Sequence, residues 1–259
     1  MGRVKTAVIL AAGMGSRLSE ITKDEIPKGL LSINGKTLVE RSIEKLRSIG
    51  IEQIYIVTGH LSFKYDELLS KYTFIKTKKN RKYKATGSMT SLAILENDIK
   101  EDFLLLESDL IYEVYALIRA INYEKDDCIL LSGKTNSGDE CYVEVRDDNL
   151  YKISKNINEI DKVYGELVGI SKISYGLYKS MIKEYKKFNF DAEQTYDFLD
   201  YKENASRKYD YENAIFDAAK ERSVGYLKIH NLVWGEIDNK DHLERIKREV
   251  LPKLEKVIS

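Results

Sequence analysis

Short apolar runs alternate with amphipathic segments throughout the first half of the chain, and this alternation constrains the fold more than any other feature. We predict buried strands at residues 3–10, 53–57, 74–77 and 103–107. Helices are predicted between them, at residues 37–49, 61–71 and 113–122, and from a cap at Thr86 or Ser88 to residue 97. Strands that alternate with helices form parallel sheets covered on both faces. The sequence therefore predicts an α/β fold with a doubly wound, mostly parallel, Rossmann-like sheet.

The pattern changes beyond about residue 127, where the predicted elements become shorter and richer in strand. Strands are predicted at residues 128–132, 141–146, 150–154, 163–173 and 226–229, and helices at residues 175–187, 211–221 and 240–256. No internal repeat, low-complexity tract or Pro- and Gly-rich linker divides the chain. We therefore expect one domain over residues 1–259, with a first half at about residues 1–126 and a small β-rich lobe within about residues 127–259.

The chain carries 42 basic and 42 acidic side chains, so its formal net charge is zero. This balance argues against a general nucleic-acid-binding protein. A basic cluster of Lys76, Lys78, Lys79, Arg81, Lys82 and Lys84 fits either a solvated face or a rim that attracts phosphate. Cys128 and Cys141 lack the spacing of a metal site or disulfide framework, and the apolar run at residues 8–12 is too short to span a bilayer. We expect a cytoplasmic protein that binds neither nucleic acid nor membrane.

The first predicted strand ends in a loop of small residues. The loop contains Leu10, Ala11, Ala12, Gly13, Gly15, Ser16 and Arg17, and Lys28 follows ten residues after Leu18. Small residues let backbone N–H groups approach a triphosphate, while Arg17 and Lys28 add positive charge. A Rossmann fingerprint would require glycine at position 18, and the loop lacks the Gly-Lys-Ser/Thr of a Walker A motif. The pattern therefore indicates a phosphate site of another type.

Two further segments bring carboxylates to the ends of predicted elements. The apolar strand at residues 103–107 leads into Asp109, and the chain's only tryptophan, Trp234, precedes Glu236 and Asp238. Ligands in open α/β sheets bind beyond the carboxyl ends of strands, which is where Asp109 lies. Asp109 and Asp238 are therefore candidate Mg²⁺ ligands. Helix caps are the alternative role for both segments, because negative charge is favourable at the start of a helix.

With these three motifs in order, the chain resembles the bacterial cytidylyltransferases that activate phosphocholine or 2-aminoethylphosphonate, and the similarity runs nearly end to end. Gly59 lies in a Val-Thr-Gly-His segment that resembles the family's strand-to-glycine turn. Thr86, Gly87 and Ser88 resemble its base-reading segment, in which small residues leave space for a pyrimidine. The tract from Tyr211 through the Trp-Gly-Glu-Ile-Asp segment looks closer to the 2-aminoethylphosphonate enzymes than to the choline enzymes.

Two positions depart from the family pattern. Four residues separate Thr22 from Pro27, which is one more than in the commonest form. Gly29 stands where many sugar-phosphate enzymes have proline. The second departure argues against a sugar-phosphate substrate and leaves the remaining chemistry untouched.

This resemblance implies a fold of the nucleotide-diphospho-sugar transferase type and a Mg²⁺-dependent reaction. In that reaction CTP and 2-aminoethylphosphonate would give CMP-2-aminoethylphosphonate and pyrophosphate. Lys28 and Arg17 would offset charge on the α-phosphate and the departing pyrophosphate, and Asp109 and Asp238 would hold the metal. The first half would bind the nucleotide, and the second half would bind a small zwitterionic phosphonate or phosphate.

The acceptor depends on side chains of two kinds. A quaternary choline head calls for an aromatic cage, to which Tyr142, Tyr211 and Trp234 could contribute. A primary ammonium calls for hydrogen-bond acceptors, and Asp139, Glu140 and Glu212 could supply them. The resemblance favours the ammonium. The alternatives are a phosphocholine cytidylyltransferase, a sugar-1-phosphate nucleotidyltransferase and a catalytically silent, nucleotide-sensing regulatory subunit. The sequence leaves open whether the chain forms a homo-oligomer or is fused to another pathway enzyme.

Overall fold

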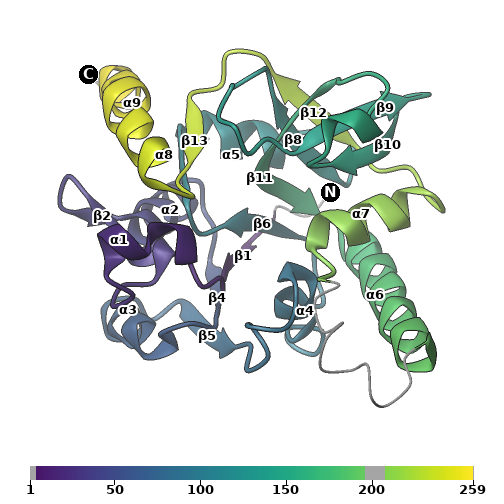
Figure 1. Cartoon of the computed structure of the whole chain (residues 1–259), viewed down its shortest axis with the longest axis horizontal. Coiled ribbons are helices and arrows are strands. Elements are labelled where there is room, and N and C mark those ends of the chain that lie inside the picture. Colours follow the sequence, from purple (N-terminus) through teal and green to yellow (C-terminus); the bar gives the residue numbers. More distant parts are fainter. Residues whose placement is uncertain (1–3, 196–207, 259) are drawn as a thin grey trace.

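The computed structural model describes residues 4–195 and 208–258, so the first residue of the strand predicted at 3–10 lies outside the described residues. A nine-stranded sheet has the order β10-β9-β11-β6-β1-β4-β5, with β8 beside β11 and β12 beside β8 (Figure 1). Its strands are β1 (Thr6–Ala11), β4 (Gln53–Thr58), β5 (Ile75–Lys79), β6 (Phe103–Glu107), β8 (Cys128–Ser132), β9 (Tyr142–Arg146), β10 (Asn149–Ser154), β11 (Gly165–Ile173) and β12 (Tyr226–Ile229). The predicted doubly wound α/β fold is confirmed.

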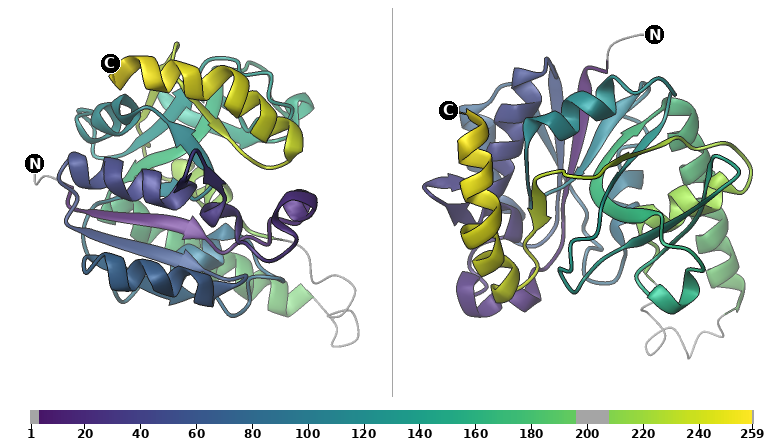
Figure 2. Two further views of the ribbon diagram at one scale, coloured as in Figure 1. Left: turned by 90° about the vertical axis from the view of Figure 1, so that its left-hand side faces the viewer. Right: turned by 90° about the horizontal axis from the view of Figure 1, so that it is seen from above.

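Helices flank this sheet (Figure 2). They are α1 (Ser19–Thr22), α2 (Leu38–Ser48), α3 (Asp66–Lys71), α4 (Ser88–Ala93), α5 (Val114–Ile121), α6 (Tyr175–Thr195), α7 (Tyr211–Ala219), α8 (Lys240–Arg245) and α9 (Leu251–Ile258). None of the helices in the described part of the chain is long and apolar enough to cross a membrane.

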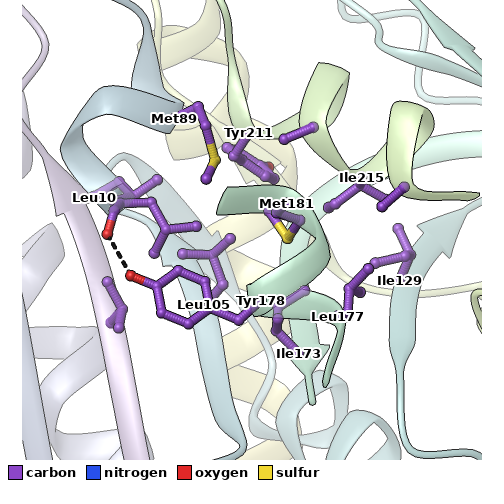
Figure 3. Close-up of a cluster of buried hydrophobic side chains, with 14 of the residues drawn as sticks. Leu10, Met89, Leu105, Ile129, Ile173, Leu177, Tyr178, Met181, Tyr211 and Ile215 are labelled. Carbon is purple, nitrogen blue, oxygen red and sulfur yellow. Dashed lines mark hydrogen bonds between the residues drawn. The ribbon is translucent and has the colours of Figure 1, made fainter. Parts of the chain in front are cut away.

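The alternating side chains of β1 enter two separate cores. Val8 and Leu10 pack in a cluster with side chains of α4, α6 and α7, part of which Figure 3 shows around Tyr178. Ala7 and Ile9 pack on the opposite face with side chains of α2, α3 and α5. A central strand that is apolar on both faces is typical of a parallel sheet covered by helices on both sides.

The parallel strands end at one edge of the sheet. Ala11 of β1 is paired with Thr58 of β4, which is paired with Lys79 of β5, and Leu10 is paired with Glu107 of β6. The loops that follow these strands therefore leave from the same edge, which is where ligands bind in open α/β sheets. This register gathers the predicted phosphate loop, the Gly59 turn and the Asp109 segment.

The β-rich lobe is built on β11, which runs antiparallel to β6, β8 and β9. The register of β11 with β8 shifts between Leu167 and Ser171, and Gly169 lies within this bulge with a φ of 76°. A Cβ at Gly169 would lie 3.1 Å from the carboxyl carbon of Glu107. Glycine therefore fits both the left-handed backbone and the space that the Glu107 side chain occupies.

Two short strands that the sequence analysis missed pair with each other. β7 (Leu110–Tyr112) and β13 (Trp234–Glu236) form an antiparallel ladder, in which Leu110 is paired with Glu236 and Tyr112 with Trp234. A hairpin of β2 (Ser32–Ile33) and β3 (Lys36–Thr37) was missed as well.

Two predicted helices differ from the structure. Gly87 is the N-cap of α4, so the prediction of Thr86 or Ser88 in that place is wrong, and Asp210 accepts the hydrogen bond from the Ser88 N–H instead. The helix predicted at residues 240–256 is interrupted by a π-helical turn, Ile246–Val250. Pro252 follows this turn and has no N–H to donate to the preceding helical turn. A wider turn ahead of a proline accommodates that missing bond.

Candidate active site

The loop that follows β1, the predicted phosphate loop, contains two glycines with different surroundings. Gly15 is the N-cap of the 3₁₀ turn η1 (Ser16–Leu18), with a φ of 65°, and a Cβ there would lie 3.3 Å from the Cβ of Lys28. A Cβ at Gly13 would meet no atom within 4 Å, so the loop borders open space at that point. The buried Leu18 fixes the turn that presents Arg17. The loop backbone is therefore accessible beside Arg17 and Lys28.

Three loops touch at the edge of the sheet. A Cβ at Gly59 would lie 2.5 Å from the carbonyl oxygen of Ala12 and 2.7 Å from the Cβ of Tyr83. Asn80 is buried and donates to Thr86 Oγ1 at 3.2 Å and to Ser91 Oγ at 3.0 Å. The sequence analysis did not identify Asn80. Its signal was weak, because an asparagine after a strand is an ordinary turn residue.

The predicted base-reading segment is tied to the start of α7. A Cβ at Gly87 would lie 2.4 Å from the carbonyl oxygen of Tyr209. The N–H and the hydroxyl of Ser88 both donate to Asp210 Oδ1, at 2.8 and 3.0 Å, and the Ser88 hydroxyl accepts from the Tyr211 N–H at 2.9 Å. The Ser88 side chain therefore joins the start of α4 to the start of α7.

Lys28 lies at the centre of an ion-pair cluster. It belongs to the 3₁₀ turn η2 (Lys28–Leu30), and its Nζ pairs with both Asp109 and Asp238. Arg17 pairs with Asp238 at 3.0 Å and with Asp139 at 2.6 Å. The side chains of Lys28, Asp109 and Asp238 are only 12–14% exposed. The structure thus brings together both predicted catalytic cations and both predicted metal ligands.

The charges of this cluster shift the ionisation of its members. Burial opposes the charge of Lys28, but the carboxylates of Asp109 and Asp238 outweigh it and raise the pKa of Lys28 above its ordinary value. Burial likewise opposes the charge of Asp238, and Lys28 and Arg17 hold its pKa below the ordinary value. Both groups are therefore charged at neutral pH.

The β7–β13 ladder explains how Asp109 and Asp238 meet. Asp109 directly precedes β7 and Asp238 lies two residues after β13, and the Ile237 N–H donates to the Asp109 carbonyl oxygen at 3.2 Å. His242 Nδ1 accepts from the Asp238 N–H at 3.3 Å, while Nε2 lies 3.0 Å from the Ser137 carbonyl oxygen. The tautomer with its proton on Nε2 satisfies both contacts and fixes the backbone at Asp238.

The acidic residues around Lys28 fit a divalent cation. Asp109 Oδ1 is buried and has no hydrogen-bond partner among the described residues. Asp238 also belongs to a group with Asp139 and Glu236, whose carboxylate oxygens lie within 4.8 Å of one another. Oxygen ligands of this kind suit Mg²⁺. Asp238 belongs both to the predicted pair of metal ligands and to the group with Asp139 and Glu236. Asp109 is not part of that group and contacts Lys28 from the segment before β7.

Gly29, the position that departs from the sugar-phosphate pattern, is tightly enclosed. A Cβ there would lie 2.9 Å from the Tyr65 hydroxyl oxygen, 2.9 Å from Val39 Cγ2 and 3.0 Å from the Cβ of Ser108. No side chain fits without a shift of these neighbours. The glycine thus lets η2 pack directly against the segment that carries Asp109.

A pocket opens beside the Lys28 cluster, between the bulge of β11 and the β7–β13 ladder. Its lining includes one aromatic side chain, Trp234, and one lysine, Lys155. Six carboxylate side chains also line it: Glu107, Asp139, Glu140, Glu166, Glu212 and Glu236. The predicted acceptor residues Asp139, Glu140, Glu212 and Trp234 are therefore among the lining residues. Lys155 and Glu166 were not predicted as acceptor residues, because Lys155 has no distinctive local sequence and Glu166 lies within a predicted strand rather than a loop.

Tyr142 and Tyr211 lie outside this lining. The Tyr211 hydroxyl is buried and donates to Glu107 Oε1 at 2.7 Å, and the Tyr142 hydroxyl donates to Glu140 Oε2 at 3.3 Å. Both tyrosines thus contact carboxylates of the pocket, and Trp234 is the single aromatic residue in the described lining. The structure does not gather the three aromatic side chains into a cage.

Burial and crowding of like charges change the ionisation of the pocket. Burial raises the pKa of Glu236 to about 9, and the charges of Glu107 and Asp109 add to the effect. Burial and the charge of Glu107 also raise the pKa of Glu212. Lys155 responds in the opposite sense: burial opposes its charge, but Glu212 and Glu107 outweigh burial and raise its pKa. A cation entering the pocket would favour ionisation of these acids.

Comparison with known proteins agrees with this geometry. The family model of the MobA-like NTP transferase domain matches residues 7–151. The chain belongs to this family. The match contains the predicted phosphate loop, Lys28, the predicted base-reading segment and Asp109, and the prediction of a nucleotidyltransferase is confirmed.

The similar proteins differ in how much of their own length aligns with this chain. The CTP:phosphoglutamine cytidylyltransferase of Campylobacter jejuni is 28% identical over 201 residues, which are 71% of this chain and 79% of that protein. The bifunctional protein GlmU of Methanococcus maripaludis is 33% identical over 173 residues, which are 67% of this chain and 39% of that protein. The chain thus corresponds to well under half of the second relative.

A solved structure shares the fold along nearly the whole chain. The inositol-1-phosphate CTP transferase from T. maritima matches with a TM-score of 0.78 at 20% sequence identity, covering 98% of each chain. The fold expected from the family resemblance is therefore confirmed, including the β-rich lobe beyond residue 151.

Proposed function

We propose that this chain is a Mg²⁺-dependent cytidylyltransferase that transfers CMP from CTP to a small zwitterionic phosphonate or phosphate, with 2-aminoethylphosphonate as its acceptor. The observation that carries the proposal is the carboxylate-lined pocket directly beside the Lys28 cluster. The names of the Campylobacter jejuni and T. maritima proteins, both of which include CTP, support the choice of nucleotide.

The lining of the pocket favours a primary ammonium over a quaternary one. A primary ammonium donates three hydrogen bonds and is best bound by carboxylates or carbonyl groups. A quaternary head has no N–H and binds on aromatic faces. Six acidic side chains, one aromatic side chain, Trp234, and one lysine, Lys155, line the pocket. This composition supports 2-aminoethylphosphonate rather than phosphocholine.

The reaction needs no general base. An oxygen of the phosphonate is already anionic near neutral pH and attacks the α-phosphorus of CTP. The new bond joins that oxygen to the α-phosphorus, and the bond from the α-phosphorus to the bridging oxygen breaks. Pyrophosphate leaves with the electron pair, so no proton has to move. Positioning and charge neutralisation then account for the catalysis.

The cluster supplies these two effects. Lys28 and Arg17 offset negative charge on the α-phosphate and the leaving pyrophosphate, and Arg17 links the phosphate loop to the acceptor pocket through Asp139. Asp109 and Asp238 would hold Mg²⁺, which neutralises charge on phosphate oxygens when bound. Glu212 and its acidic neighbours orient the ammonium end of the acceptor.

The test is pyrophosphate release with each of the four ribonucleoside triphosphates and a matched set of acceptors. 2-Aminoethylphosphonate is compared with ethylphosphonate, which lacks only the amino group, and with phosphocholine and glucose-1-phosphate. We expect release with CTP and 2-aminoethylphosphonate and at least a ten-fold lower kcat/KM for ethylphosphonate, because a charge-assisted hydrogen bond contributes about 1.5–3 kcal/mol. Equal turnover of the two phosphonates, or a preference for phosphocholine or glucose-1-phosphate, would contradict the assigned acceptor.

A further inference from the structure

Six cations gather in a part of the chain that contains no acidic residue. Between Tyr72 and Leu95 the sequence has no Asp or Glu, although the chain as a whole is neutral. The cations are Lys76, Lys78, Lys79, Arg81, Lys82 and Lys84, and the side chains of all six are exposed. Within the described parts of the chain, Lys78 is the one member with a carboxylate partner, Asp98 at 2.6 Å. Positive charge therefore accumulates in this segment, and Lys78 is the single member that a carboxylate of the described residues neutralises.

Four of these cations, Lys79, Arg81, Lys82 and Lys84, form what we call the basic loop, at the end of β5. Its backbone is held firmly: Asn80 Oδ1 accepts from the Lys82 N–H at 2.9 Å, and the Lys82 carbonyl oxygen accepts from Thr86 Oγ1 at 2.9 Å. The ammonium groups of Lys82 and Lys84 form no ion pair or hydrogen bond with the residues that the structure describes. The basic loop thus has a backbone held by hydrogen bonds and carries the ammonium groups of Lys82 and Lys84, which are unpaired among the described residues.

The basic loop is packed against the Gly59 turn, and this turn contacts the phosphate loop. Tyr83 lies between Lys82 and Lys84, and its Cβ would be 2.7 Å from a Cβ at Gly59, which in turn faces the carbonyl oxygen of Ala12. β4, which leads into the Gly59 turn, lies between β1 and β5 in the sheet (Figure 1). The unpaired cations therefore lie one turn away from the place where the proposed function puts the triphosphate.

We propose that the basic loop attracts the nucleoside triphosphate from solution and raises its rate of association, as an inference that rests on the proposed function. A nucleoside triphosphate keeps net negative charge when Mg²⁺ is bound. Exposed charges act over a Debye length of about 10 Å at about 0.1 M salt. A charged rim of this kind raises ligand concentration near the site and speeds association. The zero net charge of the chain makes a small polyanion a better ligand for the loop than a polynucleotide.

The test is direct binding of CTP with Mg²⁺, measured by stopped-flow and calorimetry at ionic strengths of about 0.05 M and about 0.5 M. The variant is Lys82→Ala/Lys84→Ala, which removes two unpaired charges and keeps the backbone bonds of the loop. The control is Lys247→Ala/Lys253→Ala, which removes two exposed lysines from the C-terminal helical segment. Circular dichroism melting checks that both variants are folded.

We expect the loop variant to bind CTP about five- to ten-fold more weakly than the control at low ionic strength, through slower association, and to differ from it by less than about two-fold at high ionic strength. Equal association rates in the variant and the control would overturn the inference and leave the proposed function standing. An affinity loss that is independent of salt would also overturn it, because it would indicate a short-range contact. If the wild-type protein bound no nucleoside triphosphate, both the inference and the proposed function would fail.

Discussion

Replacing Lys28 by methionine tests the central assignment of the site. Methionine keeps much of the length and apolar stem of lysine but removes the charge. In the wild-type protein the Lys28 Nζ is shared between Asp109 and Asp238, and all three side chains are largely buried. The substitution therefore has two consequences. It removes a cation from the proposed transition state, and it leaves two carboxylates close together without their partner.

The expected magnitudes follow from these contacts. Loss of one group that stabilises developing charge lowers kcat by about 10²- to 10³-fold. Removing one partner from a buried ion pair lowers the free energy of unfolding by about 3 kcal/mol in the absence of metal. If Asp109 and Asp238 hold Mg²⁺ as proposed, Lys28 competes with the metal for their oxygens, and its removal should also lower the Mg²⁺ concentration that gives half of maximal activity.

The assay combines pyrophosphate release at varied Mg²⁺ with thermal unfolding in EDTA and in Mg²⁺. Lys45→Met is the matched control, since Lys45 is also a partly buried lysine, lies on α2 with its Nζ 5.1 Å from the centroid of the Tyr112 ring, and does not belong to the Lys28 ion-pair cluster. We expect Mg²⁺ to stabilise Lys28→Met more than the wild type and the control to keep its activity. Near-normal turnover of Lys28→Met would refute the catalytic role. An unchanged or higher Mg²⁺ requirement would refute the competition for the two aspartates.

Two further substitutions test the metal assignment and the electrostatics of the fold. Asp109→Asn should raise the Mg²⁺ requirement sharply, because it removes a charged ligand; unchanged activity at low Mg²⁺ would show that Asp109 is not a ligand. Burial and then the charge of Arg41 lower the pKa of Lys45 to about 8 from 10.5, so the unfolded chain binds more protons between these values. Wild-type stability should therefore rise from about pH 8 to about pH 10.5, whereas Lys45→Met should lack this rise and be about 2 kcal/mol more stable at pH 7 in chemical denaturation. The same pH dependence in both proteins would contradict the burial of a charged Lys45.

The elements of the sheet were predictable because each strand carries its own local signal. The bounds of β12, Tyr226–Ile229, and of β8, Cys128–Ser132, are those predicted. β8 is a fully buried apolar run, which is a distinctive pattern within a covered sheet, whereas β12 combines Tyr226, Leu227 and Ile229 with a lysine and is mostly half-buried. The proximity of Arg17 and Lys28 to the loop after β1 was predictable for a similar reason, since these residues are close in sequence, while the phosphate-binding role of the loop stays a prediction. The division of residues 1–259 into nucleotide and acceptor halves stays a prediction.

The rest of the site depends on contacts that leave no local pattern. β7 and β13 are each three residues long. They pair although most of the β-rich lobe lies between them in the sequence. Propensity and periodicity do not detect strands that short. Lys155 and Asn80 were missed for a related reason, because a lysine near a 3₁₀ turn and an asparagine after a strand have many ordinary roles. Their positions in the site become visible once the loops are placed against each other.

The β7–β13 ladder also joins the proposed acceptor pocket to the Lys28 cluster. Trp234 and Glu236 of β13 line the pocket, while Asp238, two residues beyond the strand, pairs with Lys28. Ile237 lies between these acids and is buried in the cluster that joins α8 and α9 to Leu18 of the phosphate-loop turn. One short segment therefore fixes an acceptor-side carboxylate, a candidate metal ligand and the packing behind Arg17. Because these side chains share one short strand, the backbone sets the spacing between the proposed acceptor pocket and the predicted phosphate site, as the proposed in-line attack on the α-phosphorus would require.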